Sequence, residues 1–302
     1  MSLPLQHYIG RFAPTPSGHL HFGSLLAALA SCLDARHHNG TWLVRMEDLD
    51  LPRNRPGAAE HILSTLEVYG LHWDGEVLVQ SQRQAFYQQQ IDIWLEQQRA
   101  FYCDCSRKSL AEHDGIYPGT CRARHLTPAA DHAVRVRVPD RSSGFVDRLQ
   151  GPFSQKLQQD VGDMIVRRRD GIIAYQLAVV MDDITQGVTD IVRGADLLDS
   201  TPRQLWLYEL LEQQQPAYMH TPLVVRREGE KLSKRLASAP LDPLKVSATL
   251  LEALELLQQN PPTALRGAPA DEILAWAVPN WDASKIPACR EIRRDTADAE
   301  ET

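Results

Sequence analysis

The sequence of 302 residues lacks any apolar run long enough to cross a membrane, because a spanning helix needs roughly 20 apolar residues in succession. Its first ten residues also lack the basic and then apolar pattern of a secretory signal. We therefore expect a soluble, cytoplasmic protein. An excess of positive charge is missing too, since the formal net charge is −7. A net negative charge argues against a protein that binds nucleic acid non-specifically, although basic residues can still gather on one face.

Cysteines are few, and three of the five lie close together in the sequence. Cys103, Cys105 and Cys121 fall within nineteen residues. In a cytosolic chain such a cluster favours a metal site over disulfides. Zinc takes four ligands in a tetrahedron, commonly thiolate and imidazole, so the chemistry alone suggests His125 or His113 as the fourth ligand.

The first fifty residues predict a strand, a breaker-rich loop, a helix and a second strand. The strands are expected at residues 8–12 and 40–46, and the helix at 24–36. This order makes a parallel βαβ unit, in which ligands bind at the carboxyl ends of the strands. A second α/β stretch at 161–212 includes a helix at 201–215, which we expect Thr201 to cap.

The chain is expected to divide into four segments. Residues 1–99 and 151–240 form the two halves of one α/β domain, and residues 100–150 form an insertion with the metal site. Prolines, glycines and clustered cysteines mark this insertion. Residues 241–302 form a short helical region.

The loop and helix start at residues 14–24, PTPSGHLHFGS, carry the first chemical motif. His21 and Gly23 stand where the helix begins, so free backbone N–H groups and the positive end of the helix dipole face the site. Gly23 lets an adenine ring or a phosphate approach the backbone. His21 can donate a hydrogen bond to a triphosphate and stabilise charge in the transition state.

The second motif is KLSKR at residues 231–235, preceded by a charged segment with a glycine. Lys231 and Lys234 flank Ser233, and on a mobile loop the lysines can close over a triphosphate. Their charge would offset that of a leaving pyrophosphate.

Together the two motifs resemble the HIGH and KMSKS signatures of class I aminoacyl-tRNA synthetases. Four further segments resemble the glutamyl branch of that family: RFAPTPSG at 11–18, RMEDLD at 45–50, YQLAVVMDD at 175–183 and VTDIVRG at 188–194. The resemblance covers roughly residues 8–240. It implies a Rossmann-type class I synthetase catalytic domain, with a small zinc-binding insertion and a short helical C-terminal region.

The chemistry of four residues agrees with a glutamate substrate. A bidentate guanidinium suits a carboxylate, and Arg11 and Arg193 each stand at the end of an expected strand. Glu47 can accept from the substrate ammonium, and Tyr175 offers a hydroxyl. An internal ion pair between Arg11 and Glu47 is the structural alternative.

The resemblance assigns further residues and cofactors. It implies that Ala13 and Thr15 join the glutamate site, and that His21, Gly23 and the KLSKR loop bind ATP with Mg²⁺. It also implies that Tyr117, rather than a histidine, is the fourth ligand of one structural zinc ion. His21 and Lys234 are the expected catalytic residues, because adenylate formation needs positioning and charge stabilisation but no enzyme nucleophile.

Only sixty residues follow Asp242, which we interpret as too few for the large anticodon-reading domain of a glutamyl-tRNA synthetase. This pattern resembles the truncated paralogues called glutamyl-Q tRNA(Asp) synthetases. The resemblance implies that the chain, expected to be a monomer, activates glutamate without tRNA. It would then attach glutamate to queuosine at the wobble position in the anticodon stem-loop of tRNA(Asp).

Two alternatives stay open at this point. One is a truncated glutamyl-tRNA synthetase that charges a tRNA 3′ end, alone or with a separate anticodon-binding partner. The other is a non-catalytic tRNA-binding module built on a decayed synthetase. The presence of His21, Lys234, Arg11 and Glu47 argues against decay.

Overall fold

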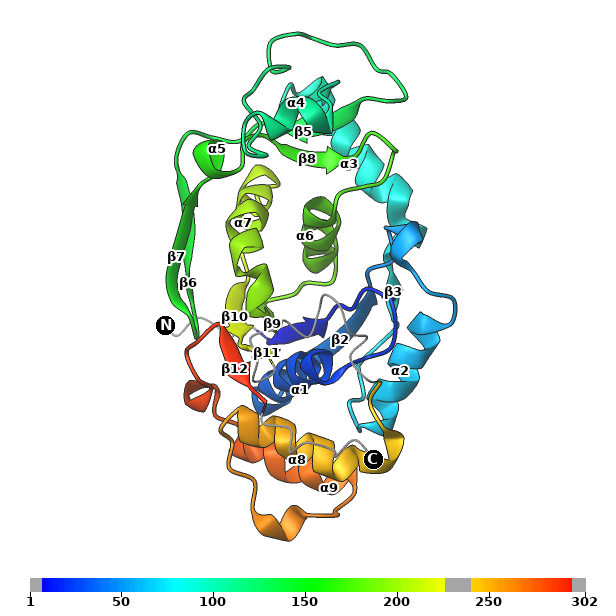
Figure 1. Ribbon diagram of the computed structural model, residues 1–302, viewed down its shortest axis with the longest axis vertical. Helices are drawn as coiled ribbons and strands as arrows, with labels where there is room; N and C mark the ends of the chain where they lie inside the picture. Colours follow the sequence, from blue (N-terminus) through cyan, green and yellow to red (C-terminus); the bar gives the residue numbers. More distant parts are fainter. Residues whose placement is uncertain (1–6, 226–239, 295–302) are drawn as a thin grey trace.

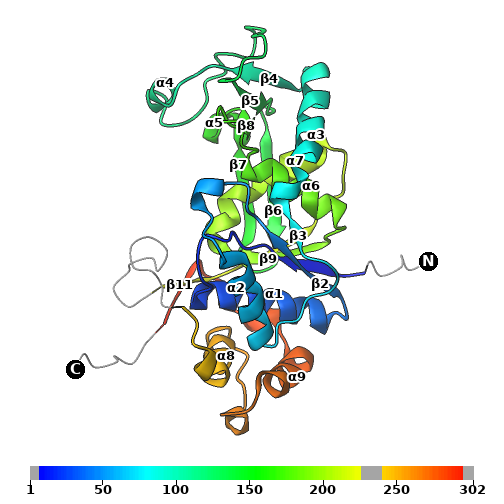
Figure 2. The same cartoon turned by 90° about the vertical axis from the view of Figure 1, so that its right-hand side faces the viewer.

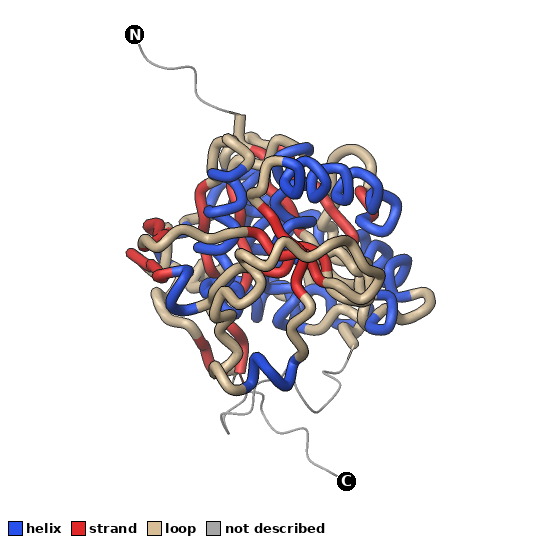
Figure 3. The backbone as a smooth tube through the Cα atoms, turned by 90° about the horizontal axis from the view of Figure 1, so that it is seen from above, coloured by secondary structure: helices blue, strands red, loops and turns tan. Residues whose placement is uncertain are grey.

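The computed structural model describes residues 7–225 and 240–294, and the molecule is elongated (Figures 1 and 2). Parallel strands lie near the middle of its length, and strands run through the centre when it is viewed from above (Figure 3). A helical region forms one end, and the cysteine-bearing insertion forms the other (Figures 1 and 2). Among the described residues no helix is both long and apolar enough to cross a membrane.

The central strands carry the first motif and its neighbours. β1 (Ile9–Phe12), β2 (Thr41–Met46) and β3 (Leu78–Val79) pair in parallel in that order. β9 (Asp190–Gly194) pairs in parallel with β10 (Ala217–Thr221). The backbone N–H of Thr189 donates to the carbonyl of Ile9 over 2.9 Å, which places β9 beside β1.

Helix α1 (Phe22–His37) is the centre of the larger apolar core. Nearly its whole surface is buried, which explains the continuous run of small and apolar residues in its sequence. It packs against β1, β2 and β9 and also against α8 (Val246–Leu256) and α9 (Ala270–Asn280). α2 (Ala58–Val68) contributes Ile62 and Leu66 to the same core.

A second core lies between the central strands and the insertion (Figure 1). It is built by α3 (Gln84–Glu96), α6 (Tyr175–Thr185) and α7 (Thr201–Leu210) with strands of the insertion. α7 ends at Leu210, five residues before the predicted end. The prediction of Thr201 as its cap is wrong: Ser200 precedes the helix, and the Thr201 hydroxyl accepts from Arg193 at 2.8 Å.

The insertion contains a three-stranded antiparallel sheet. Its order is β4 (Ala100–Cys103), β5 (Ala133–Val136) and β8 (Met164–Arg167). The short helix α4 (Arg107–Ala111) follows β4, and α5 (Leu157–Asp160) precedes β8. Because β8 lies after residue 150, the sheet continues beyond the segment that composition marks as the insertion.

One hairpin connects the insertion to the central strands. β6 (Ser142–Asp147) and β7 (Gly151–Lys156) pair antiparallel and run alongside α7 from the insertion toward β10 (Figure 1). The C-terminal region is not purely helical, since β12 (Glu291–Arg293) pairs in parallel with β11 (Leu223–Val225).

Candidate active site

The loop after β1 is fastened to the end of β2. The N–H of Glu47 donates to the carbonyl of Pro14 at 3.0 Å, and the N–H of Arg55 donates to that of Pro16 at 2.9 Å. Thr15 lies between these anchors and accepts at its carbonyl from Ser17 over 2.8 Å. Ala13, Thr15 and Glu47 are therefore close along one edge of the sheet, as the βαβ prediction requires.

His21 is the N-cap residue of α1, which confirms its predicted place at the helix start. Its Nδ1 accepts from the N–H of Ser24 at 3.2 Å, and its Nε2 lies 3.0 Å from the Ser24 hydroxyl. Burial lowers the pKa of His21, so the imidazole is neutral at neutral pH. A Cβ on Gly23 would lie 3.3 Å from two atoms of the imidazole ring. Glycine at this position thus leaves room for the histidine.

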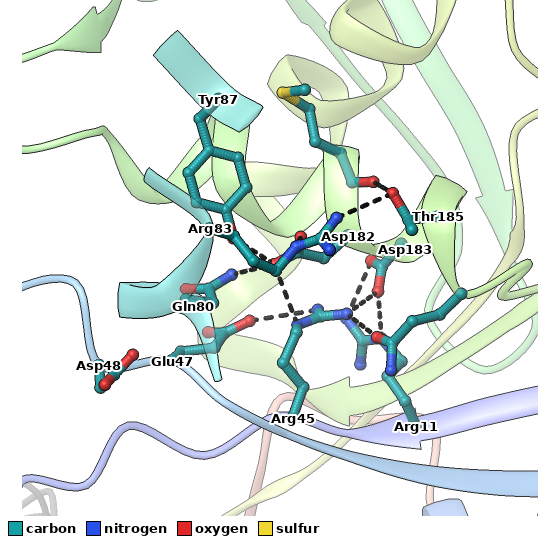
Figure 4. Close-up of polar contacts among 12 residues, drawn as sticks. Arg11, Arg45, Glu47, Asp48, Gln80, Arg83, Tyr87, Asp182, Asp183 and Thr185 are labelled. Carbon is teal, nitrogen blue, oxygen red and sulfur yellow. Dashed lines mark hydrogen bonds and ion pairs between the residues drawn. The ribbon is translucent and has the colours of Figure 1, made fainter. Parts of the chain in front are cut away.

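Buried charges form a cluster where the strands end (Figure 4). Arg11 donates to Asp183 through Nε at 3.1 Å and Nη2 at 3.4 Å. Arg45 donates to the same carboxylate at 2.8 Å and to Glu47 at 3.3 Å. The alternative of an Arg11–Glu47 ion pair is therefore wrong, because Arg11 pairs with Asp183 and Glu47 pairs with Arg45.

The neighbouring carboxylate, Asp182, is also fully partnered. Gln80 and Tyr87 each donate to it at 2.8 Å, and Arg83 donates at 2.9 Å (Figure 4). Arg45 lies 3.9 Å from it. Two consecutive acidic residues of α6 thus bind β1, β2 and the start of α3 to one another.

Glu47 and Asp183 differ in how well their charge is compensated. Burial acts to raise the pKa of Asp183, but the guanidinium groups of Arg11 and Arg45 hold it below its usual value. Burial likewise raises the pKa of Glu47, and there Arg45 and Arg11 do not offset it. The Glu47 carboxylate would therefore gain from one more cation, such as an ammonium group.

Arg193, at the end of β9, presents an unused donor. Its Nε donates to His220 at 3.0 Å and its Nη2 to Thr201 at 2.8 Å. Its Nη1 is buried and has no hydrogen-bond partner among the described residues. An unpaired guanidinium nitrogen inside a protein is costly, so this atom is suited to an anionic ligand.

The charges of Arg11, Arg193 and Glu47 all act on the hydroxyl of Tyr175. Burial raises the pKa of its hydroxyl, the nearby charge of Glu47 adds to the rise, and Arg193 and Arg11 oppose it. The hydroxyl therefore lies within the electrostatic reach of all three groups. These electrostatic influences place Tyr175 near Arg11, Glu47 and Arg193, whereas Lys231, Ser233 and Lys234 lie outside the described residues.

Sequence patterns assign no role to three further residues of this site: Arg45, Asp183 and His220. A signal was present for the first two. Arg45 interrupts an apolar strand, and Asp183, together with Asp182, follows the apolar stretch of α6 and is still buried. A charge in a buried element needs partners, and that need points to a cluster.

The cysteine cluster of the insertion has the geometry of a metal site. The sulfur atoms of Cys103, Cys105 and Cys121 all lie within 4.8 Å of one another, and those of Cys105 and Cys121 are 3.5 Å apart. Zinc–sulfur bonds of about 2.3 Å place two tetrahedral thiolates about 3.8 Å apart, so the three sulfurs fit.

Tyr117 lies beside the three cysteines. Its hydroxyl accepts from the N–H of Cys121 at 2.7 Å, which keeps it beside the sulfurs. Gly162 makes this placement possible, because a Cβ there would lie 2.3 Å from the Tyr117 carbonyl oxygen. His113 and His125 are exposed, and neither belongs to the one group of metal-binding side chains found among the described residues.

Comparisons with known proteins agree with this geometry. The catalytic-domain family of class I tRNA synthetases (E and Q) matches residues 9–249. A glutamate tRNA ligase from Elizabethkingia meningosepticum, solved in complex with its amino acid, superposes with a TM-score of 0.78 at 25% identity, covering 95% of this chain and 67% of that one. A glutamate-tRNA synthetase from Elizabethkingia anophelis gives 0.79 at 25% identity over 96% and 68% of the two chains.

The fold and the site thus define a class I aminoacyl-tRNA synthetase catalytic domain, a ligase of the glutamyl branch. Curated relatives narrow the assignment. The glutamyl-Q tRNA(Asp) synthetase of Ectopseudomonas mendocina is 58% identical over 94% of this chain and 97% of its own. That of Pseudomonas aeruginosa strain PAO1 is 56% identical over 93% and 96%. The chain belongs to the glutamyl-Q tRNA(Asp) synthetase family.

Proposed function

We propose that this enzyme activates L-glutamate with ATP in the absence of tRNA and then transfers it to queuosine in the anticodon of tRNA(Asp). The α-carboxylate of glutamate attacks the α-phosphate of ATP, which forms glutamyl-adenylate and releases pyrophosphate. The adenylate then passes its glutamyl group to a hydroxyl of queuosine, with AMP leaving. We place the reaction in the cytoplasm, carried out by a monomer.

The Nη1 atom of Arg193, which is buried and has no hydrogen-bond partner in the described part of the chain, carries the substrate assignment. A side-chain carboxylate satisfies this donor, and a neutral amide does so less well because charge-assisted hydrogen bonds are stronger. Glu47 accepts from the substrate ammonium, and that cation offsets its buried charge. Arg11, Tyr175 and the loop of Ala13 and Thr15 complete the glutamate site.

The nucleotide is assigned to the start of α1. Gly23 and the free N–H groups of the first turn receive ATP, and His21 hydrogen-bonds to its phosphates. Lys231, Ser233 and Lys234 of the KLSKR loop complete the site, with Lys234 stabilising the leaving pyrophosphate. Mg²⁺, bound with ATP, neutralises phosphate charge. One zinc ion on Cys103, Cys105, Tyr117 and Cys121 holds the insertion, which we propose receives the anticodon stem-loop.

Glutamate-dependent ATP–pyrophosphate exchange tests the first half of this proposal. We expect robust exchange with no tRNA and none when glutamine replaces glutamate. Exchange that requires tRNA(Glu) would instead favour conventional charging. No exchange under any condition would favour a non-catalytic module.

Transfer of labelled glutamate tests the second half. An isolated anticodon stem-loop of tRNA(Asp) that carries queuosine should accept glutamate, and the same stem-loop with guanosine at that position should not. The acceptor arm with its 3′ end serves as the control. Labelling of that arm in place of the stem-loop would overturn the proposed acceptor.

The Gly23→Ala variant tests the phosphate-binding role of the helix start. The added methyl would lie 3.3 Å from His21 ring atoms, so the ring must move by a few tenths of an ångström. Alanine is the better helix former by about 0.5–1 kcal/mol, so the melting temperature should stay or rise slightly. We expect kcat for exchange to fall about tenfold, because the displaced ring weakens one hydrogen bond worth about 0.5–1.5 kcal/mol. Unchanged kcat would contradict a role for His21.

A further inference from the structure

A buried chain of polar side chains stands behind Arg193. The carboxylate of Asp147 accepts from Nδ1 of His220 at 2.6 Å. Nε2 of His220 accepts from Nε of Arg193 at 3.0 Å. All three residues are buried, with exposures of 2%, 0% and 5% in that order. Solvent therefore competes little with these hydrogen bonds, and each partner fixes the next.

The protonation state of His220 follows from its two neighbours. A guanidinium carries hydrogen on every nitrogen, so Nε2 of the imidazole must supply a lone pair to Arg193. Nδ1 then carries the proton that is donated to Asp147. Burial lowers the pKa of His220, and the charge of Arg193 acts in the same direction, which agrees with a neutral ring. Only one tautomer therefore fits between the carboxylate and the guanidinium.

Hydrogen bonds to the backbone hold Asp147 and His220 in place. Asp147 ends β6 and also accepts from the N–H groups of Leu149 and Gln150 at 2.9 and 2.8 Å, which closes the hairpin tip. The side chain of Gln150 donates to the carbonyl of His220 at 2.9 Å. The tip of the β6–β7 hairpin is thus fastened to β10, beside the strand that carries Arg193.

We propose that Asp147 and His220 are positioning residues for the substrate carboxylate. This inference rests on the proposed role of Arg193 in binding glutamate. Asp147 orients His220, and His220 and Thr201 hold two of the three guanidinium nitrogens. The third nitrogen, Nη1, is thereby left buried and free for the ligand. Without the imidazole acceptor the guanidinium can rotate, and Nη1 no longer meets the carboxylate of glutamate.

Two substitutions at His220 separate positioning from packing. His220→Gln keeps a side-chain oxygen that can accept from Arg193, whereas His220→Leu fills space without an acceptor. Loss of a buried hydrogen bond to a charged group is worth about 10- to 100-fold in affinity. We therefore expect His220→Leu to raise the KM for glutamate in exchange by about that factor. His220→Gln should recover most of the loss, and the KM for ATP should change less than about twofold in both variants.

Asp147→Asn tests the next residue in the series of hydrogen bonds. It removes the charge that favours a proton on Nδ1 of His220, while the side chain keeps its size and shape. Its glutamate KM should lie between those of the wild type and His220→Leu. Calorimetric titration with glutamate alone, without ATP, should reproduce the order of affinities. Melting temperatures identify any variant that fails to fold.

The outcomes distinguish this inference from the function it rests on. Wild-type enzyme that binds no glutamate overturns the proposed function and the positioning role with it. Wild-type binding that is retained in folded His220→Leu overturns the positioning role alone. Equal losses in the Gln and Leu variants, or parallel losses in the KM values for ATP and glutamate, would show a general structural role and would also overturn it.

Discussion

Replacing Cys105 with alanine should abolish transfer of glutamate to tRNA while leaving tRNA-independent exchange within about twofold of wild type. The residue lies in the insertion, at the opposite end of the molecule from α8 and α9 (Figures 1 and 2). Exchange needs the glutamate and ATP sites, which the strands and α1 build. Transfer needs the surface that meets the stem-loop as well.

Transfer should be lost completely because little besides the metal site stabilises the segment around residues 104–132. The apolar cluster around the cysteines contains only four buried residues: Phe101, Cys103, Tyr117 and Cys121. Residues 104–132 contain one helix, of five residues. So small a core cannot offset the entropy of ordering the chain. A structural zinc site contributes about 10–16 kcal/mol at neutral pH, so the segment should unfold without its metal.

Two measurements and one control variant check this prediction. Metal analysis should find about one zinc per wild-type chain and less in Cys105→Ala. Limited proteolysis should cut the variant between residues 104 and 132 first. Cys289→Ala serves as the matched control, because that partly exposed cysteine lies far along the chain and outside the cluster. Full transfer by a zinc-free variant would show that the metal is dispensable.

The elements nearest the first motif could be predicted from the sequence because short-range patterns determine them. The run of small and apolar residues from Phe22 onward forms α1, and the loop before it is rich in proline and glycine. His21 at the helix start follows from that pattern. The parallel strands on either side then require their carboxyl ends, with Arg11 and Glu47, to lie together.

The partners of these residues could not be predicted in the same way. Arg45 and Asp183 are 138 positions apart, and their contact depends on how α6 packs over the strands. For this reason the ion pair that the sequence leaves open as an alternative, Arg11 with Glu47, names the wrong partners. His220 carried no signal as a single histidine in a strand, and its role emerges only from the hydrogen bonds that join it to Asp147 and Arg193.

Replacing Asp183 with asparagine should destabilise the protein by about 3–5 kcal/mol, the cost of removing one partner from a buried ion pair. Its carboxylate is 2% exposed and accepts from Arg11 and Arg45, whose side chains are 4% and 0% exposed. Without that charge two buried guanidinium groups lose their shared partner. Urea unfolding at neutral pH measures the difference, with Asp170→Asn as a control. That substitution breaks a 2.6 Å pair with Arg168 that is 37–49% exposed, and it should cost less than about 1 kcal/mol.

The difference in stability between wild type and Asp183→Asn should depend on pH, which a loss of packing alone would not produce. Because the pKa of Asp183 is depressed in the folded protein, its contribution is fully present above its unfolded value of about 3.9. The stability gap between wild type and Asp183→Asn should therefore be constant from neutral pH down to about pH 5. It should shrink as the pH falls below that unfolded value and be lost once the pH has fallen through the lower folded pKa.

A second consequence concerns the substrate. Asp183 fixes the Nε and Nη2 atoms of Arg11, and in the variant that guanidinium is free to turn toward Glu47, the other carboxylate whose charge acts on its pKa. Such a pair would occupy the acceptor proposed for the glutamate ammonium. The glutamate KM of folded Asp183→Asn should then rise far more than the KM for ATP. Equal changes in the two values would mean that Asp183 supports the fold without ordering the glutamate site.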